Sequence, residues 1–253
     1  MQQMRALIWV SIQEMIRMRL GWVFISLTLF LFALSFLFGA LSFDERTRML
    51  LHFGFLGVHL SGIALAIVFG SQLLQKELEK QTCLVVLSRN VSREKFLLSK
   101  ALTFFLVWGA AGLSLIALLW MLLTFQFSAL QMFVVFLGSY LESAVIFSVA
   151  LLLSISTRPL IAGSASLGIY LISHWSQEVA YFGEKVGNPV LSIVGKVSQY
   201  LFPRLYEANW RSIYFMEHPI SLNHFLWTGF HLLAWTVLLI VASMLTFRRR
   251  DLV

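Results

Sequence analysis

The chain is a series of apolar runs of about 20 residues or more, separated by short polar segments. A run of that length crosses about 30 Å of hydrocarbon as an α-helix. A transmembrane β-barrel would show alternating segments of about 10 residues, and this sequence contains none. Hydrophobic residues make up 59% of the chain and charged residues 12%, whereas soluble domains are about half apolar and about a quarter charged. The sequence therefore predicts an all-α integral membrane protein with one transmembrane domain over residues 1–253.

We expect six membrane-spanning helices, the fifth of them short. They lie at about residues 21–43, 49–74, 96–125, 130–156, 160–175 and 224–247. An even number of spans puts both termini on one side of the membrane, and about 13 of the 19 Lys and Arg residues fall on that side. The positive-inside rule then predicts that both termini are cytoplasmic. The net charge of +7 comes from residues that flank apolar runs and meet anionic headgroups, so we do not interpret it as a nucleic-acid signal.

Residues 1–20, before the first span, have the pattern of an amphipathic helix that lies in the membrane interface. Their apolar side chains recur at helical spacing: Met4, Leu7, Ile8, Ile12 and Met15. The alternative is that this segment simply extends the first span.

Residues 176–223, between the fifth and sixth spans, are too many for a plain connection. Asn188 and Pro189 have the pattern of a helix cap followed by proline in the first turn, and Pro203 would end that helix. We expect one or two short helices that dip into the outer membrane surface. A folded cap without a role in transport is the alternative.

A strongly charged segment, from Lys76 to Lys95, joins the second and third spans. It contains a short apolar stretch, Cys83 to Leu87, and we expect Thr82 to Leu87 to form a short helix across the membrane surface. Ser92 can cap the helix that follows, with Glu94 in its first turn. A plain positive-inside loop would explain the charge but not the apolar stretch within it.

The segment from Gln75 to Lys100 resembles the first cytoplasmic loop of type-2 ABC-transporter permeases. In that family an acidic residue and a Thr precede an apolar triplet, a Ser-x-Pro-Val-Ser-Arg-like turn and a Gly-Lys pair. Tyr200 to Leu205 resembles the segment before the family's last span, and Phe247 to Leu252 resembles its usual C-terminus. This sequence departs from the pattern in having Gln81 for Gly, Asn90 for Pro and Ser99 for Gly.

The resemblance implies the permease subunit of an ATP-driven exporter in a bacterial-type cytoplasmic (inner) membrane. The loop of residues 75–96 would carry the coupling helix that docks on a separate cytoplasmic ATPase, and residues 1–20 would be the elbow helix. The residues that would couple to the ATPase are Glu77, Gln81, Thr82, Leu84, Val85, Leu87, Arg89 and Arg93. The chain itself has no Gly-x-x-x-x-Gly-Lys-Ser/Thr motif, so we expect no enzymatic activity and no cofactor of its own. ATP and Mg²⁺ would bind the partner, and a second permease copy or a related chain would complete the membrane part.

Glu142 lies near the middle of the fourth span, where an acidic side chain costs a few kcal/mol of free energy. It either lines a substrate path or a dimer interface, or holds the bundle together as a protonated or paired residue. His59 and His231 are its candidate partners. Ser164 and Gly168 form a small-xxx-small pair, which would lie at a permease–permease contact or pack within the chain.

Two other function classes remain open at this point. One is a membrane anchor or assembly factor that has the same fold without transport. The other is an intramembrane haem-binding or metal-binding protein, with a site drawn from His52, His59, Glu142 and His231. Two histidines without nearby carboxylates or Cys are a weak metal signal, and Cys83 is the only cysteine, so we expect no metal.

Overall fold

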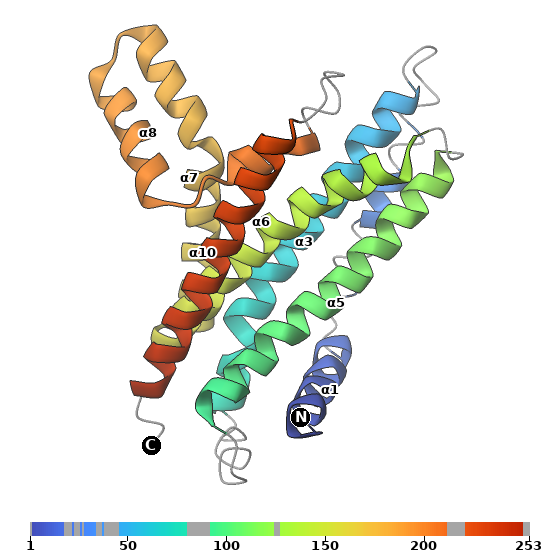
Figure 1. Ribbon diagram of the computed structural model, residues 1–253, viewed down its shortest axis with the longest axis vertical. Coiled ribbons are helices and arrows are strands. Elements are labelled where there is room, and N and C mark those ends of the chain that lie inside the picture. Colours follow the sequence, from blue (N-terminus) through green and yellow to red (C-terminus); the bar gives the residue numbers. More distant parts are fainter. Residues whose placement is uncertain are drawn as a thin grey trace.

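The structure, a computed structural model, describes residues 2–17, 22, 26, 28–33, 37, 46–79, 92–123, 127–211 and 221–249. Regular structure in these residues is helical, as the apolar runs predict, and they contain no β-strand. In chain order the helices are α1 (Gln2–Arg17), α3 (Arg46–Glu79), α5 (Arg93–Leu122), α6 (Ala129–Ser156), α7 (Pro159–Val186), α8 (Pro189–Leu201), the 3-10 helix η1 (Leu205–Ala208) and α10 (Leu222–Arg249). The long helices run side by side in an elongated bundle, and α7 and α8 form a hairpin at one end (Figure 1).

Four of the described helices are long and apolar enough to cross a membrane. The qualifying segments are Thr47–Gln75, Arg93–Leu122, Ala129–Ser156 and Leu222–Arg249. They correspond to the second, third, fourth and sixth predicted spans. The predicted first span, residues 21–43, falls largely outside the described residues. Four long apolar helices indicate a membrane-embedded protein.

The predicted fifth span is the beginning of a longer helix. Helix α7 starts at Pro159 but continues past Trp175 to Val186, and it is not among the four candidate spans. Its second half contains Gln177, Glu178 and Glu184, which fall in the external segment predicted for residues 176–223. Gln and Glu are good helix formers, however, and polarity alone does not end a helix. The predicted loop of residues 176–223 therefore begins with a continuation of α7.

Helix α6 is the central element of the bundle, and every residue from Leu141 to Leu151 is buried. Phe147 of α6 stacks on Phe104 of α5 with ring centroids 4.1 Å apart. Helix α3 approaches so closely at Gly70 that a Cβ there would lie 2.8 Å from the Phe147 carbonyl oxygen. Small residues at such crossings let helix backbones pack in direct contact.

Gln75 joins the end of α3 to the end of α6. Its Nε2 donates hydrogen bonds to the carbonyl oxygens of Ser154, at 2.5 Å, and Thr157, at 2.6 Å. The last carbonyls of a helix have no partner within it, so a buried side-chain donor satisfies them. Gln75 thereby ties the last part of α3 to the end of α6.

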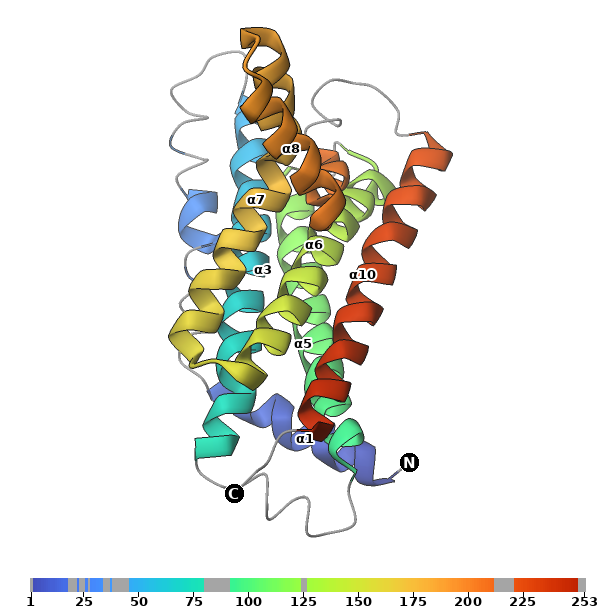
Figure 2. The ribbon, with the colours of Figure 1, turned by 90° about the vertical axis from the view of Figure 1, so that its left-hand side faces the viewer.

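Helix α1 lies across the end of the bundle at which α10 ends (Figure 2). Buried Lys100 of α5 anchors it, with Nζ 2.8 Å from Ser11 Oγ and 3.2 Å from Glu14 Oε2. Met15 is buried and the other residues of the predicted apolar stripe are partly buried, whereas Trp9 and Ile16 are exposed. The bundle therefore covers part of the predicted apolar stripe.

The α7–α8 hairpin is built as the Asn188–Pro189 pattern predicts. Asn188 Oδ1 accepts hydrogen bonds from the backbone N–H groups of Val190 and Leu191, and Pro189 is in the first turn of α8. Gly187 provides the left-handed turn between the helices, with φ of 71°. A Cβ at Gly195 would lie 2.4 Å from the Ala180 backbone nitrogen, so α8 lies directly on α7.

An ion pair closes the hairpin, with Lys196 Nζ 2.8 Å from Glu184 Oε1. This hydrogen bond raises the pKa of Lys196 above its usual value. The opposite face of α8 has no cover within the described chain: its exposed apolar residues are Val190, Ile193, Val194, Val197, Tyr200 and Leu201. Such a face suits contact with lipid or with another protein.

Candidate functional site

A group of polar side chains meets in the interior of the bundle, between α3, α6 and α7. Glu142 of α6 is only 1% exposed. Its Oε2 lies 3.7 Å from Nε2 of His59 on α3 and 3.9 Å from Nδ1 of His174 on α7. His59 Nε2 also forms a 2.9 Å hydrogen bond with the hydroxyl of Tyr170 on α7. One carboxyl group therefore faces two imidazoles that come from two other helices.

The aromatic rings of this cluster are packed against one another. Tyr170 and His174 are four residues apart on α7, so they share one helix face, and their rings stack with centroids 5.6 Å apart. The His59 and His174 ring centroids are 6.2 Å apart. This packing holds the imidazole edges toward Glu142.

The close approach of α3 to α5 and α6 brings His59 within reach of Glu142. Gly62, three residues after His59, has no side chain at the crossing point. A Cβ at Gly62 would lie 2.5 Å from Ser143 Oγ of α6 and 2.5 Å from the Trp108 ring of α5. Any larger residue at Gly62 would push α3 away and separate the imidazole from the carboxyl group.

The chain after α8 returns to the bundle and adds a positive charge to the cluster. Leu205, Ala208 and Trp210 are buried there. A Cβ at Gly138, one turn before Glu142 on α6, would lie 2.4 Å from the Ala208 carbonyl oxygen. The guanidinium of Arg211 then lies near enough to interact electrostatically with Glu142, His59 and His174.

The cluster is short of hydrogen bonds within the described part of the chain. Neither carboxylate oxygen of Glu142 has a hydrogen-bond partner there, nor do His174 Nδ1 and the Arg211 NH1 group. An unsatisfied buried polar group costs about 1–3 kcal/mol, and unmet groups in a native protein call for a functional explanation. The cluster can take up or release a proton, and it can hydrogen-bond to a polar group that enters the bundle.

The structure brings two of the predicted intramembrane residues together and separates the others from them. Glu142 and His59 meet, as described above. His231 Nε2 instead lies 3.4 Å from the backbone N–H of Arg204, from which it accepts a hydrogen bond. His52 is exposed on α3 and contacts Phe53 edge-on. No group of three or more His, Cys, Asp and Glu side chains among the described residues could hold a metal ion.

Ser164 and Gly168 lie away from the Glu142 cluster, on the outward side of α7. Ser164 is exposed, and its hydroxyl donates to the Ile161 carbonyl oxygen of the same helix at 3.2 Å. A Cβ at Gly168 would meet nothing within 4 Å. The face that carries this small-xxx-small pair thus has room for another helix.

Most of the predicted ATPase-coupling residues lie outside the described part of the chain: Gln81, Thr82, Leu84, Val85, Leu87 and Arg89. Glu77 falls in the last turn of α3. Arg93 is the first residue of α5, and its NH1 donates a 3.1 Å hydrogen bond to the Arg248 carbonyl oxygen at the end of α10. Ser92 caps α5 as expected, since its Oγ accepts from the Lys95 N–H.

Three members of the cluster were missed in the sequence: Tyr170, His174 and Arg211. Tyr170 and His174 stand four residues apart within the predicted fifth span, and that spacing is a signal which could have identified them. Arg211 belongs to a segment that we expected outside the membrane, so only the fold could bring it to Glu142.

A scan of the chain against protein-family models finds no match, and a search of curated proteins finds none either.

Proposed function

We propose that this chain is the permease subunit of an ATP-driven type-2 ABC exporter. Six spans would cross a bacterial-type cytoplasmic membrane with both termini in the cytoplasm. Two permeases, either identical or related, would pair around the substrate path. Separate ATPase subunits would bind ATP and Mg²⁺, and this chain would catalyse no reaction itself.

One observation carries the proposal: an apolar stretch, Cys83 to Leu87, stands inside a charged segment that joins two helices able to cross a membrane. A solvated loop gains nothing from five consecutive residues of this kind. A partner with an apolar groove would bury them, and the surrounding charges would fix its orientation. A cytoplasmic ATPase is the partner that the resemblance of this segment implies.

Contacts at the same end of the bundle support a coupling role. The last turn of α3 and the first turn of α5 lie at the end of the bundle where α1 lies and α10 ends (Figures 1 and 2). Arg93 bonds to the Arg248 carbonyl oxygen, and Glu94 Oε1 lies 3.9 Å from Arg248 NH1. Lys100 binds α1. A partner that pushed on the ends of α3 and α5 would therefore also move α1 and α10, because these contacts join the helices. The helices would move as rigid bodies.

An exporter also needs a substrate path and a contact between its two permeases. The buried cluster suits the first, and the outward face of α7 suits the second. Glu142, His59 and His174 offer polar groups at a depth where a polar substrate would need them. Ser164 and Gly168 offer a face at which a second permease could approach closely.

Purification of the tagged chain from its native membrane tests the proposal. We expect an ATPase subunit of about 25–35 kDa with a Walker A motif to co-purify in stoichiometric amount. The purified complex should hydrolyse ATP. Recovery of the chain with partners that contain no nucleotide-binding motif would favour an anchor or assembly factor.

Thiol labelling tests the proposed topology. In a Cys83→Ser background, Lys185→Cys at the exposed tip of the α7–α8 hairpin should react with a membrane-impermeant maleimide in intact cells, and Ser88→Cys should not. Both should react after permeabilisation, which controls for accessibility. Labelling of Ser88→Cys alone in intact cells would reverse the orientation.

A further inference from the structure

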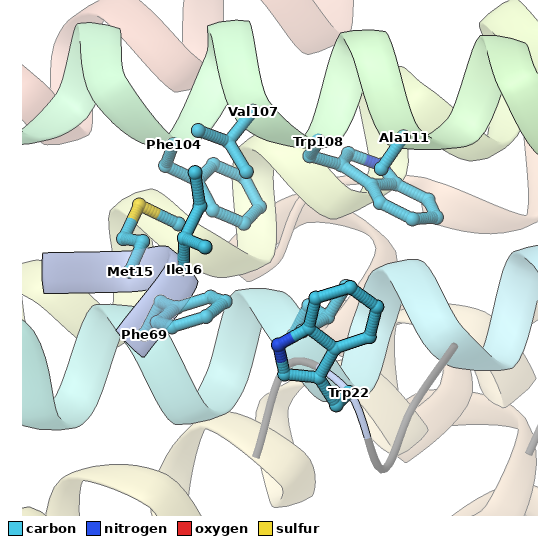
Figure 3. A pocket seen from close by; sticks show the side chains of 9 residues that line it. Met15, Ile16, Trp22, Phe69, Phe104, Val107, Trp108 and Ala111 are labelled. Atoms are coloured by element: carbon cyan, nitrogen blue, oxygen red, sulfur yellow. The ribbon is translucent and has the colours of Figure 1, made fainter. Parts of the chain in front are cut away.

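An apolar pocket of about 340 Å³ lies where the end of α1 meets α3 and α5 (Figure 3). Nine residues line it, and none of them is charged. Met15 and Ile16 come from α1, Phe69 from α3, and Phe104 and Ala111 from α5. The volume is that of a small-molecule site, but the lining provides almost no polar group to orient a polar ligand.

The depth of the pocket matches one leaflet of a membrane. Lys100 binds Ser11 and Glu14, so α1 crosses α5 near Lys100. Phe104 and Ala111 follow Lys100 on this helix, so a rise of about 1.5 Å per residue places the α5 wall from about 6 Å to about 16 Å beyond α1. Half of a hydrocarbon core of about 30 Å is about 15 Å.

A basic residue directly follows the α1 residues that line the pocket. Arg17, in the last turn of α1, is exposed and directly follows the lining residues Met15 and Ile16. Basic residues at the end of an interfacial helix attract anionic lipid headgroups. The arrangement therefore matches that of a phospholipid. The charge lies where the headgroup would be, at the membrane surface, and the apolar lining lies deeper, where an acyl chain would be.

We propose that this pocket binds one acyl chain of an anionic phospholipid from the leaflet in which α1 lies, with the headgroup at Arg17. The bound chain would contact α1 through Met15 and α5 through Phe104, and would stabilise the docking of α1. The inference depends on the membrane placement of the bundle and is independent of any ATPase partner.

Photolabelling of the full-length chain tests this site. The purified protein is reconstituted into phosphatidylcholine vesicles that contain phosphatidylglycerol with a diazirine in the middle of one acyl chain. Labels on the wild-type chain are expected to map to Met15–Arg17 and to Phe104–Ala111. Labels spread evenly over outward-facing residues such as Leu106 and Leu113 would mean bulk lipid only and would overturn the proposal. This comparison needs no variant.

Two matched pairs of variants sharpen the test. Ala111→Phe fills the pocket and should reduce its labelling about tenfold, the effect of losing about two buried methylene groups. Ala110→Phe, on the exposed side of α5, should leave labelling unchanged. Arg17→Gln should weaken phosphatidylglycerol labelling about fivefold and Arg5→Gln should not.

Three results would contradict the proposal. Equal labelling of Ala111→Phe and Ala110→Phe would exclude the pocket as the binding site. Equal labelling by phosphatidylglycerol and by a diazirine-bearing phosphatidylcholine would exclude the role of Arg17. Cross-links between α1 and a second copy of the chain would show that protein, rather than lipid, occupies the pocket.

Discussion

Replacement of both Leu84 and Leu87 by Asp is expected to release the ATPase subunit while the helical bundle stays folded. These two residues are the largest apolar side chains of the stretch that we propose to dock. A carboxylate forced into an apolar interface without a partner costs about 2 kcal/mol or more. Two of them should therefore lower the affinity by at least about 100-fold. Quantitative pull-down of the ATPase measures this loss, and the melting temperature of the chain shows whether it remains folded.

The matched control places the same chemistry at the other end of the bundle. Val190 and Val194 are exposed on α8, 66% and 52% respectively, so their double replacement by Asp adds the same charge without touching the charged segment. The control variant should recover the ATPase at the wild-type level. If the Leu84/Leu87 variant also does, the stretch from Cys83 to Leu87 is no docking surface.

The span positions in the described chain were predictable because hydrocarbon thickness sets helix length. Helices α3, α5, α6 and α10 each contain a run of the required length and composition. Local capping was equally readable: Ser92 begins α5, and Asn188 with Pro189 begins α8. These signals depend on residues that are adjacent in sequence, so no tertiary information is needed to interpret them.

The fifth predicted apolar run, residues 160–175, is shorter than helix α7, and the apolar pattern of α1 did not show which contacts hold that helix. Helix α7 extends to Val186 because Gly183 and Ala180 let α8 pack directly against its polar second half. Helix α1 is held against the bundle because Lys100 of α5 binds Ser11 and Glu14. Both outcomes depend on contacts between segments far apart in sequence, which periodicity does not record.

The Glu142 cluster was only partly predictable from the sequence. A carboxyl group in the middle of an apolar run is conspicuous, and His59 was one of its two candidate partners. The choice of His59 over His231 is made by Gly62, which lets α3 approach α6. Arg211 reaches the cluster only because Ala208 and Trp210 pack against α6 beside Gly138. Both results depend on helix–helix contacts that only the three-dimensional structure reveals.

The final prediction is that Glu142 is needed for function and not for stability. Neither of its oxygens has a hydrogen-bond partner among the described residues, and its ion-pair distances to His59 and His174 are long, at 3.7 and 3.9 Å. Glu142→Leu therefore removes the desolvation cost of a buried carboxyl group and strands no hydrogen-bonded neighbour. We expect the free energy of unfolding to stay the same or to rise. Glu142→Gln keeps the shape and loses the charge. In both variants we expect ATP hydrolysis by the assembled complex to fall about tenfold, which corresponds to about 1.4 kcal/mol of coupling.

His59→Leu provides the structural comparison, because His59 is hydrogen-bonded to Tyr170 at 2.9 Å. Its removal leaves a buried hydroxyl without that partner and should lower the free energy of unfolding by about 1–3 kcal/mol. Thermal melting of the three variants therefore separates the roles of the two residues. If Glu142→Leu melts as early as His59→Leu, the carboxyl group holds α3, α6 and α7 together. If Glu142→Leu keeps both its melting temperature and its ATP hydrolysis, the carboxyl group has neither role. Unchanged melting with loss of ATP hydrolysis is the result expected of a charge retained for function at a cost in stability.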